Sequence, residues 1–303
     1  MERCSVRRWN ERPFKTWKRL MLSVVITALN EPYLQETIDS VFDNARGEVE
    51  CIAVLDGYRS DIHEHKDLTL IYHPEPHGQR QSINEGTKLA RGKFFMKLDA
   101  HCLLDEGYDL KLAESCKPDW TVIPRRHGIK EDKWRKRNGR IDYMRLTCPL
   151  EKGDLGLRAT AWQDYRKRPD RKDKNIDSVM TCQGSGWFQY LDKFREHGCL
   201  DEGHGHWGAM GCEVGCKAWL SGGRLVVNKD TWYAHWQRGR RHTANSMEST
   251  SRYYDLPRQV VKDAHRYARN LWLNNNWPLQ KREFKWLIDK FSPVPGWEKW
   301  QSQ

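Results

Sequence analysis

The chain has 303 residues, which allows one large α/β domain or two small ones, and its formal net charge of +11 favours anionic partners. Its longest apolar run, residues 21–29, is far shorter than the ~20 residues of a membrane-spanning helix, and no signal-like segment follows the basic N-terminus, so we expect a cytoplasmic protein without a membrane contact. Nine scattered cysteines argue against a disulfide scaffold and favour reduced thiols.

The first predicted strand follows a basic arm. Residues 1–20 are polar and basic and contain tryptophan. Residues 22–28 are rich in Val and Ile, and this run ends before Asn30 and Pro32, which stop a strand. Apolar residues then recur at helical spacing over residues 34–41. The pattern predicts a strand, a loop and a helix.

The same alternation continues through the first hundred residues. Apolar runs predict strands over residues 51–55, 68–72 and 94–98, and helical spacing predicts a helix over residues 82–89. Strands that alternate with helices predict an α/β fold with a mostly parallel sheet flanked by helices. Ligands of such a sheet bind at the carboxyl ends of its strands, where Asn30, Asp56 and Asp99 fall.

The second half of the chain is less regular. Residues 125–175 are strongly basic and weakly patterned, which predicts an inserted surface. Beyond it, we expect a Gly-rich strand-like piece from Met180, a helix over residues 212–220, a strand over 224–228, and helices over 255–272 and 279–291. The predicted organisation is a basic arm (1–20), a large α/β domain containing the basic insertion (21–245), and a C-terminal helical extension (246–303).

Asp99 and His101 follow the strand over residues 94–98, with the small Ala100 between them. In an extended segment, side chains at positions i and i+2 point to the same side, so a carboxylate and an imidazole can reach one divalent cation. Such a cation can neutralise the charge that develops on a leaving diphosphate. An isolated Asp-x-His triplet, however, more often holds an Asp that caps a turn and an ordinary half-buried His.

The context of this triplet resembles the GT-A glycosyltransferases, especially family 2 and the polypeptide N-acetylgalactosaminyltransferases, whose metal motif is Asp-x-Asp or Asp-x-His. The resemblance covers roughly residues 21–102 and 180–241. It implies a GT-A fold and sugar transfer from a nucleotide-sugar, most often a UDP-sugar, with Mn²⁺ or Mg²⁺ as cofactor. The segments that carry it are Val25–Glu31, His77–Gly86, Gly198–Gly223 and Trp232–His235.

The resemblance also implies roles for individual residues. The implied metal ligands are Asp99, His101 and His235. The implied contacts of the nucleotide-sugar are Thr27, Ala28, Leu29, Glu31, Asp56 (at the base), Arg80, Asp99, Gly186 and Arg238 (at the diphosphate). The implied catalytic residues on the acceptor side are Asp201, Trp207 and Glu213.

One departure from the family pattern concerns the catalytic base. Inverting family 2 enzymes carry a Glu-Asp pair, whereas the corresponding stretch here keeps only Glu213. Glu213 either deprotonates the acceptor hydroxyl in an inverting reaction or only orients the acceptor while the leaving phosphate takes the proton in a retaining one. Both outcomes stay open at this point.

Three basic clusters, at residues 3–19, 125–172 and 237–242, indicate a large anionic acceptor, of which DNA is the first candidate. Aromatic residues interleaved with them could stack on an unpaired base, although tryptophans in the core beneath a solvated charged face give the same pattern. These residues are Trp134, Trp162, Tyr165 and Trp236. The segment 286–297 resembles the tail of bacteriophage-encoded glycosyltransferases, which implies 5-hydroxymethylcytosine or 5-hydroxymethyluracil in phage DNA as the acceptor, inside the host cytoplasm.

Two alternatives remain. The similarity of residues 198–223 to enzymes that glycosylate polypeptide favours a protein or a surface glycan as the acceptor. A different class of protein, a nucleic-acid-binding protein without catalysis, would place a structural zinc ion among the following residues, although their spacing matches no common zinc finger. They are Cys199, His204, His206, Cys212 and Cys216.

Overall fold

The computed structural model describes residues 5–7, 22–130, 133–149, 156–171, 173–236 and 258–301. Within these ranges the chain forms one 11-stranded sheet, with the strand order β1-β4-β3-β2-β5-β12-β7-β13-β11, and a second sheet of two strands. In the large sheet, β6 also pairs with β13 and β8 pairs with β7. The strands are β1 (Ser5–Arg7), β2 (Leu22–Ala28), β3 (Val49–Asp56), β4 (Leu68–His73), β5 (Phe94–Asp99), β6 (Cys102–Leu104), β7 (Trp120–Lys130), β8 (Arg135–Ile141), β9 (Met144–Thr147), β10 (Arg158–Ala161), β11 (Ile176–Ser178), β12 (Gly186–Tyr190) and β13 (Arg224–His235).

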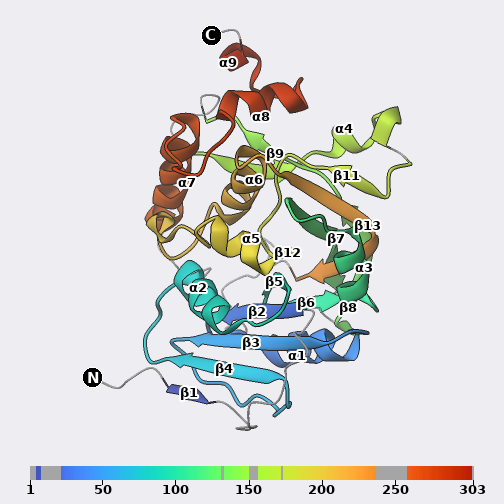
Figure 1. The fold of residues 1–303 in the computed structure, drawn as a ribbon, viewed down its shortest axis with the longest axis vertical. Coiled ribbons are helices and arrows are strands. Elements are labelled where there is room, and N and C mark those ends of the chain that lie inside the picture. Colours follow the sequence, from blue (N-terminus) through green and yellow to red (C-terminus); the bar gives the residue numbers. More distant parts are fainter. Residues whose placement is uncertain are drawn as a thin grey trace.

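The helices fall between and after these strands (Figure 1). The α-helices are α1 (Leu34–Asp43), α2 (Gln79–Leu89), α3 (Tyr108–Ser115), α4 (Gln163–Arg166), α5 (Leu191–Glu196), α6 (Met210–Leu220), α7 (Arg258–Leu273), α8 (Phe284–Phe291) and α9 (Glu298–Gln301). Two short 3-10 helices are η2 (Pro169–Arg171) and η3 (Glu202–His204). No helix in the described ranges is both long and apolar enough to cross a membrane.

The parallel strands expected in the first half of the chain are confirmed. β2 pairs in parallel with β3 and β5, and β3 with β4. Both β2 and β3 are buried along their whole length, which explains why most of their residues are apolar. Helix α2 packs closely on these two strands because Gly86 has no side chain: a Cβ there would lie 2.7 Å from Cγ1 of Val25.

The second half adds antiparallel strands, so the complete sheet is mixed. β12 is antiparallel to both of its neighbours, β5 and β7, while β13 runs parallel to β7. β6, which starts just after His101, is antiparallel to the end of β13 and sets Cys102 opposite His235. A backbone hydrogen bond of 3.0 Å from Trp236 N to His101 O continues the pairing. This register brings the end of β13 to the end of β5.

The C-terminal helices share the core of the sheet. They lie at the end of the molecule opposite β1 and β4 (Figure 1). Trp272 and Trp297 are fully buried in the same apolar cluster as β2, and the indole of Trp297 donates to Leu146 O at 2.9 Å. Residues 258–301 therefore pack into the same apolar core as the sheet.

The basic stretch 125–175 is partly a continuation of the sheet. β7 runs on to Lys130, and β8 returns antiparallel to it, with the backbone of Arg140 opposite His127. The expectation that aromatic residues in and near this stretch stack on a base is wrong for three of them. Trp162, Tyr165 and Trp236 are 5 %, 3 % and 3 % exposed, because they pack into the apolar clusters.

Trp134 lies closer to the surface. Its ring stacks on Tyr33 at a centroid distance of 4.1 Å, and both belong to a small apolar cluster with Ile129, Ala234 and Trp236. This cluster joins the turn between β7 and β8 to the loop that follows β2. The basic hairpin β7–β8 is thereby attached next to the carboxyl ends of β2 and β13.

Candidate active site

A cavity of about 460 Å³ opens at the carboxyl ends of β2 and β5, where β13 also ends. One wall comes from Thr27 and Glu31, and the floor from Lys97, Asp99, Ala100, His101 and His235. The remaining wall comes from residues 183–185, residues 207–212 and single residues of neighbouring elements. The position agrees with the rule that parallel α/β sheets bind ligands at the carboxyl ends of their strands.

Asp99, His101 and His235 meet on the floor of this cavity. The Nε2 atom of His235 lies 3.1 Å from Oδ2 of Asp99 and 3.0 Å from Nε2 of His101. The His101 Nε2 atom lies 4.0 Å from the same carboxylate oxygen. These separations are close to the ~3 Å between neighbouring ligand atoms of a divalent cation with bonds of about 2.1 Å. The three side chains therefore fit a metal ion.

Glu31 holds His101 in this orientation. Its Oε2 atom lies 2.9 Å from Nδ1 of His101, which leaves Nε2 directed at the other two side chains. A carboxylate behind an imidazole in this way fixes the ring and makes it a better metal ligand. One carboxylate with two imidazoles is also a donor set used by divalent transition metals that keep open coordination positions.

The protonation states of Asp99 and His235 suit metal binding. Burial alone would raise the pKa of Asp99, but Lys97 and His235 hold it well below its usual range, so the carboxylate is ionised. Burial lowers the pKa of His235 to about 4, so this ring is neutral. Burial also acts to lower the pKa of His101, but the hydrogen bond with Glu31 outweighs it and raises the pKa above the ordinary value.

Three buried polar atoms around the cavity have no hydrogen-bond partner among the described residues. They are Thr27 Oγ1, Glu31 Oε1 and His235 Nδ1. An unpaired buried polar atom costs about 1–3 kcal/mol, so such atoms call for an additional partner. The lining thus offers both a metal-binding floor and spare hydrogen-bonding groups for a polar ligand.

Two small residues that line the cavity lie just before Gly186, the predicted sugar contact. Gly184 and Ser185 line the cavity, and Gly184 adopts a φ of +92°, which favours glycine. Gly186, the predicted donor contact, is buried within β12, where a Cβ would lie 3.0 Å from the ring of Tyr233. Its small size allows the ring of Tyr233 to pack against it, and its role as a sugar contact stays a prediction.

The predicted nucleotide-binding residues divide into two groups. Thr27 and Glu31 line the cavity, whereas Ala28 and Leu29 are buried beside it and are absent from its lining. Asp56 is fully buried, and its carboxylate accepts hydrogen bonds from the backbone N–H groups of His77 (2.7 Å) and Gly78 (2.9 Å). The expectation that Asp56 meets the base is therefore not met in this geometry, because its oxygens already bind the backbone.

Arg80 and Glu213 pair with each other rather than with substrates. The Arg80 Nε donates to Glu213 Oε2 at 2.9 Å, and both side chains are buried outside the cavity lining. The other carboxylate oxygen of Glu213 accepts from Asp201 N at 2.6 Å and lies 3.0 Å from Lys217 Nζ. The structure therefore places Arg80 and Glu213 in a buried ion pair, and their nucleotide-binding and general-base roles stay predictions.

The other two acceptor-side residues differ in position. Trp207 lines the cavity, as expected for a residue near the acceptor. Asp201 lies outside the lining: its side chain caps η3 by accepting from Gly203 N at 2.9 Å and accepts from the Tyr267 hydroxyl at 3.0 Å. Asp201 therefore anchors α7 to the domain. Arg238 lies outside the described residues.

Sequence reasoning missed two polar residues of the site, Lys97 and Gln79. Lys97 precedes Asp99 by two positions on β5, a spacing that places both on one face and could have identified it. The Gln79 amide donates to Asp99 Oδ1 at 3.2 Å, but nothing in the sequence marks this contact. Among the described residues, the zinc cluster proposed around Cys199 and Cys216 does not assemble: the groups that could hold a metal are the site above and one formed by His73, His77 and Glu85.

Comparisons with known proteins agree with this architecture. The family model for glycosyl transferase family 2 matches residues 23–196. Polypeptide N-acetylgalactosaminyltransferase 4 of Mus musculus is 25% identical over 293 residues, which cover 89% of this chain and 48% of that protein. A crystal structure of GalNAc-T7 with UDP, GalNAc and Mn²⁺ matches with a TM-score of 0.61 at 18% identity, covering 84% of this chain and 49% of that chain. The chain spans about half the length of these relatives, and the GT-A fold is confirmed.

Proposed function

Because this chain belongs to glycosyl transferase family 2, we propose that it transfers a sugar from a UDP-sugar, held by a divalent cation at Asp99, His101 and His235, to an acceptor hydroxyl. The observation that carries this proposal is the convergence of the three side chains on the floor of one cavity. The related structure that contains UDP and Mn²⁺ supports the same choice of donor and metal.

The residues around the cavity have separate tasks in this reaction. Glu31 orients His101, and Asp99 stays ionised. Mn²⁺ or Mg²⁺, when bound, supplies positive charge that stabilises the departing diphosphate. Thr27 Oγ1 and Glu31 Oε1 are available to hydrogen-bond the donor, since neither has a partner among the described residues. Lys97 also lines the cavity, where its positive charge would add to that of the metal.

The fate of the acceptor proton follows from the carboxylates that reach the cavity. In the described lining these are Glu31 and Asp99. The Oε2 atom of Glu31 is paired with His101 and its Oε1 atom is assigned to the donor, while Asp99 is assigned to the metal. Glu213 is buried away from the cavity. We therefore propose that a phosphate oxygen of the leaving UDP accepts the proton, while the bond from the anomeric carbon to the phosphate oxygen breaks and the bond to the acceptor oxygen forms on the same face of the sugar.

For the acceptor we propose a hydroxymethylpyrimidine, 5-hydroxymethylcytosine or 5-hydroxymethyluracil, in phage DNA, which places the reaction in the host cytoplasm. The support is electrostatic. Residues 135–140 of β8 are all exposed, and four of them are Arg or Lys. β8 pairs with the end of β7, which itself pairs with β13 up to His235. An anionic polymer bound to this hairpin would pass close to the cavity.

A polypeptide acceptor is the second candidate. The observation in its favour is the similarity to polypeptide N-acetylgalactosaminyltransferase 4 over 89% of the chain. A Ser or Thr hydroxyl on a peptide could enter the same cavity beside Trp207. The similarity of the stretch 198–223 to such enzymes, noted above, points in the same direction.

One experiment separates these acceptors. The purified chain, with Mn²⁺ and a panel of UDP-sugars, is incubated with oligonucleotides containing hydroxymethylcytosine, hydroxymethyluracil or only unmodified bases, and with Ser/Thr-containing peptides. Mass spectrometry then detects the added sugar. We expect a sugar mass on the hydroxymethylated oligonucleotides alone. Glycosylated peptide with unchanged DNA would establish the second candidate, and no product on any DNA would rule out the first.

A further inference from the structure

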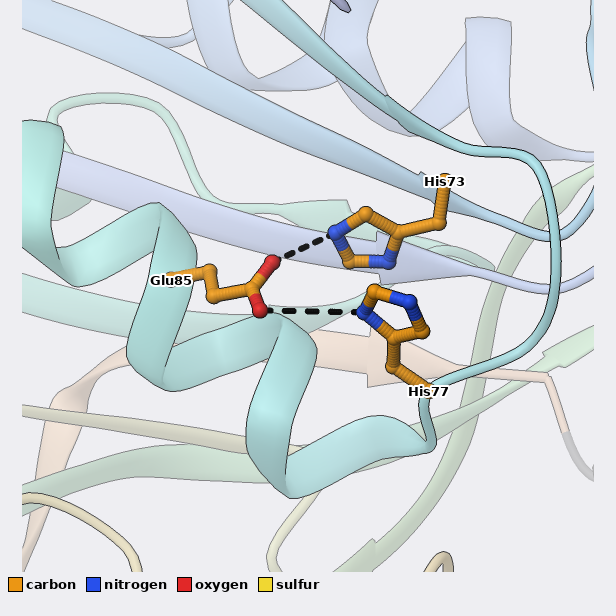
Figure 2. A group of neighbouring side chains, drawn as sticks. All are labelled: His73, His77 and Glu85. Carbon is orange, nitrogen blue, oxygen red and sulfur yellow. Dashed lines mark hydrogen bonds and ion pairs between the residues drawn. The ribbon is translucent and has the colours of Figure 1, made fainter. Parts of the chain in front are cut away.

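A second cluster of metal-ligating side chains lies outside the cavity (Figure 2). His73 ends β4, His77 belongs to the loop before α2, and Glu85 projects from α2 toward both rings. The Nε2 atom of His73 lies 2.5 Å from Oε2 of Glu85, and Nδ1 of His77 lies 3.7 Å from Oε1. None of the three lines the cavity, so this cluster is separate from the proposed catalytic metal site.

Asp56 supports this cluster from behind. Its Oδ1 atom lies 2.9 Å from Nδ1 of His73, which turns Nε2 of that fully buried ring toward Glu85. Asp56 is itself fixed by the backbone N–H groups of His77 and Gly78. A ligating histidine whose second nitrogen is bound to a carboxylate is the usual arrangement at zinc sites. In this structure Asp56 thus contacts His73.

The open side of the cluster gives access to solvent. The side chain of His73 is fully buried, whereas those of Glu85 and His77 are 25% and 34% exposed. The rings of His73 and His77 stack with centroids 4.0 Å apart, and the ligand atoms of all three residues lie within 4.8 Å of one another. Three protein ligands, two of them partly exposed, suit a four-coordinate zinc ion that takes water as its fourth ligand. The Gln81 amide, which donates to Glu85 Oε1 at 3.1 Å, would move aside for the ion.

We propose that His73, His77 and Glu85 bind one Zn²⁺ ion as a site distinct from the catalytic metal. Binding replaces the proton shared between His73 Nε2 and Glu85 Oε2, and that proton leaves to solvent. Ligand atoms in tetrahedral zinc sites are about 3.3 Å apart, so the 2.5 Å contact must widen by less than 1 Å. The partly exposed Glu85 side chain can move this far.

A bound ion would link the two ends of the loop between β4 and α2, because His73 ends β4 and Glu85 lies on α2. This loop leads to Gln79, whose amide donates to Asp99 at 3.2 Å. The backbone N–H of Gln79 also donates a hydrogen bond of 2.9 Å to His206 O at the same turn. Zinc at this position acts as a structural clamp rather than as part of the transfer reaction.

The experiment uses the full chain with Asp99→Ala, so that the catalytic site no longer binds metal well. This background is titrated with Zn²⁺ alone by calorimetry, and Co²⁺ is used in parallel to record visible absorption. We expect one Zn²⁺ per chain with a Kd of about 1 µM or tighter, and the intense absorption of tetrahedral Co²⁺. His77→Gln and Glu85→Gln, added singly, should each weaken binding at least about 100-fold.

The matched control is His63→Gln, because His63 is exposed and lies outside the cluster. This variant should bind Zn²⁺ like the background protein. Circular dichroism confirms that each variant is folded, and His77 and Glu85 are chosen over the buried His73 for that reason. No Zn²⁺ binding below about 100 µM in the background, or equal binding in the cluster variants and the control, would overturn the proposal and leave a hydrogen-bonded His–Glu pair.

Discussion

The ammonium group of Lys97 lies against the carboxylate of Asp99, two residues further along the same strand. Lys97 is buried and also donates to Gly184 O at 3.0 Å, so its position is fixed from two sides. The negative charge of Asp99 is thereby balanced before any metal arrives. Lys97 consequently stabilises the metal-free site. Its positive charge also repels a bound cation and lowers the metal affinity.

Lys97→Met should separate these two effects. Removing one partner of a buried ion pair costs about 3–5 kcal/mol, so the metal-free variant should be less stable than the wild type. Mn²⁺ should bind the variant more tightly, because the like charge beside Asp99 is gone. Thermal unfolding with and without Mn²⁺ measures both. A Mn²⁺-induced rise in Tm no larger than that of the wild type would show that Lys97 does not oppose the metal.

Glu31→Gln should weaken the metal site without removing a ligand. Glu31 orients His101 through a hydrogen bond of 2.9 Å, and loss of such a partner typically lowers metal affinity about 10–100-fold. Electron paramagnetic resonance of free Mn²⁺ during a titration measures the affinity directly. Glu36→Gln, an exposed change on α1, is the control and should bind as the wild type does. Equal affinities of the two variants would remove Glu31 from the metal site.

Glu213→Gln should act on stability. The variant leaves Arg80 and Lys217 without their buried partner, which should cost about 3–5 kcal/mol of unfolding free energy at pH 7. Urea unfolding measures this loss, and Glu196→Gln, whose partner Lys193 forms a surface pair at 3.3 Å, should stay within about 0.5 kcal/mol of the wild type. A fully stable Glu213→Gln protein that no longer transfers sugar would return Glu213 to the role of catalytic base.

The buried Glu213 carboxylate should also make the stability of the protein depend on pH. Burial alone would raise the pKa of Glu213, but Lys217, His204 and Arg80 hold it well below the usual value. A lowered folded-state pKa means that the stabilisation is fully present above the unfolded-state pKa of about 4.3 and is lost as the pH falls below it. The wild type should therefore lose stability more steeply than Glu213→Gln between about pH 5 and pH 3. Parallel curves for the two proteins in acid would contradict this account.

The basic hairpin gives a prediction for DNA. Arg135 and Arg137 are exposed on β8 and are changed together to Ala. Each lost phosphate contact should reduce the slope of log affinity against log salt by about 0.9 for duplex DNA. The control also loses two positive charges, at exposed lysines outside the hairpin, through Lys66→Ala and Lys88→Ala. Fluorescence anisotropy at several salt concentrations should show a smaller slope for the β8 variant only; equal slopes would exclude the hairpin as the DNA contact.

Local patterns were sufficient to predict the parallel half of the sheet. The apolar run that ends before Asn30 gave β2, and the one that ends at Asp99 gave β5. The pairing of Cys102 with His235 joins residues far apart in the chain, and only the family resemblance linked His235 to Asp99. No local pattern reports such a register.

The charged residues were harder to place. Arg80 and Glu213 carry the side chains expected of a substrate site, yet they satisfy each other across 133 positions of sequence. Asp56 likewise turns inward to His73. Whether a charge faces a ligand or another part of the protein depends on these distant partners, so residue type alone could not decide it. Trp162 packs into the apolar core although it belongs to the strongly basic stretch 125–175.

The most direct test of the central claim is calorimetric titration of UDP into the chain, in Mn²⁺ and in EDTA, because it needs no knowledge of the acceptor. The wild type and the control His63→Gln should bind UDP in Mn²⁺ and lose at least about 100-fold in affinity in EDTA. Asp99→Ala and His235→Ala should show that loss even with Mn²⁺ present. UDP binding of equal strength in EDTA, or in either of these two variants with Mn²⁺, would contradict a donor site built on Asp99, His101 and His235.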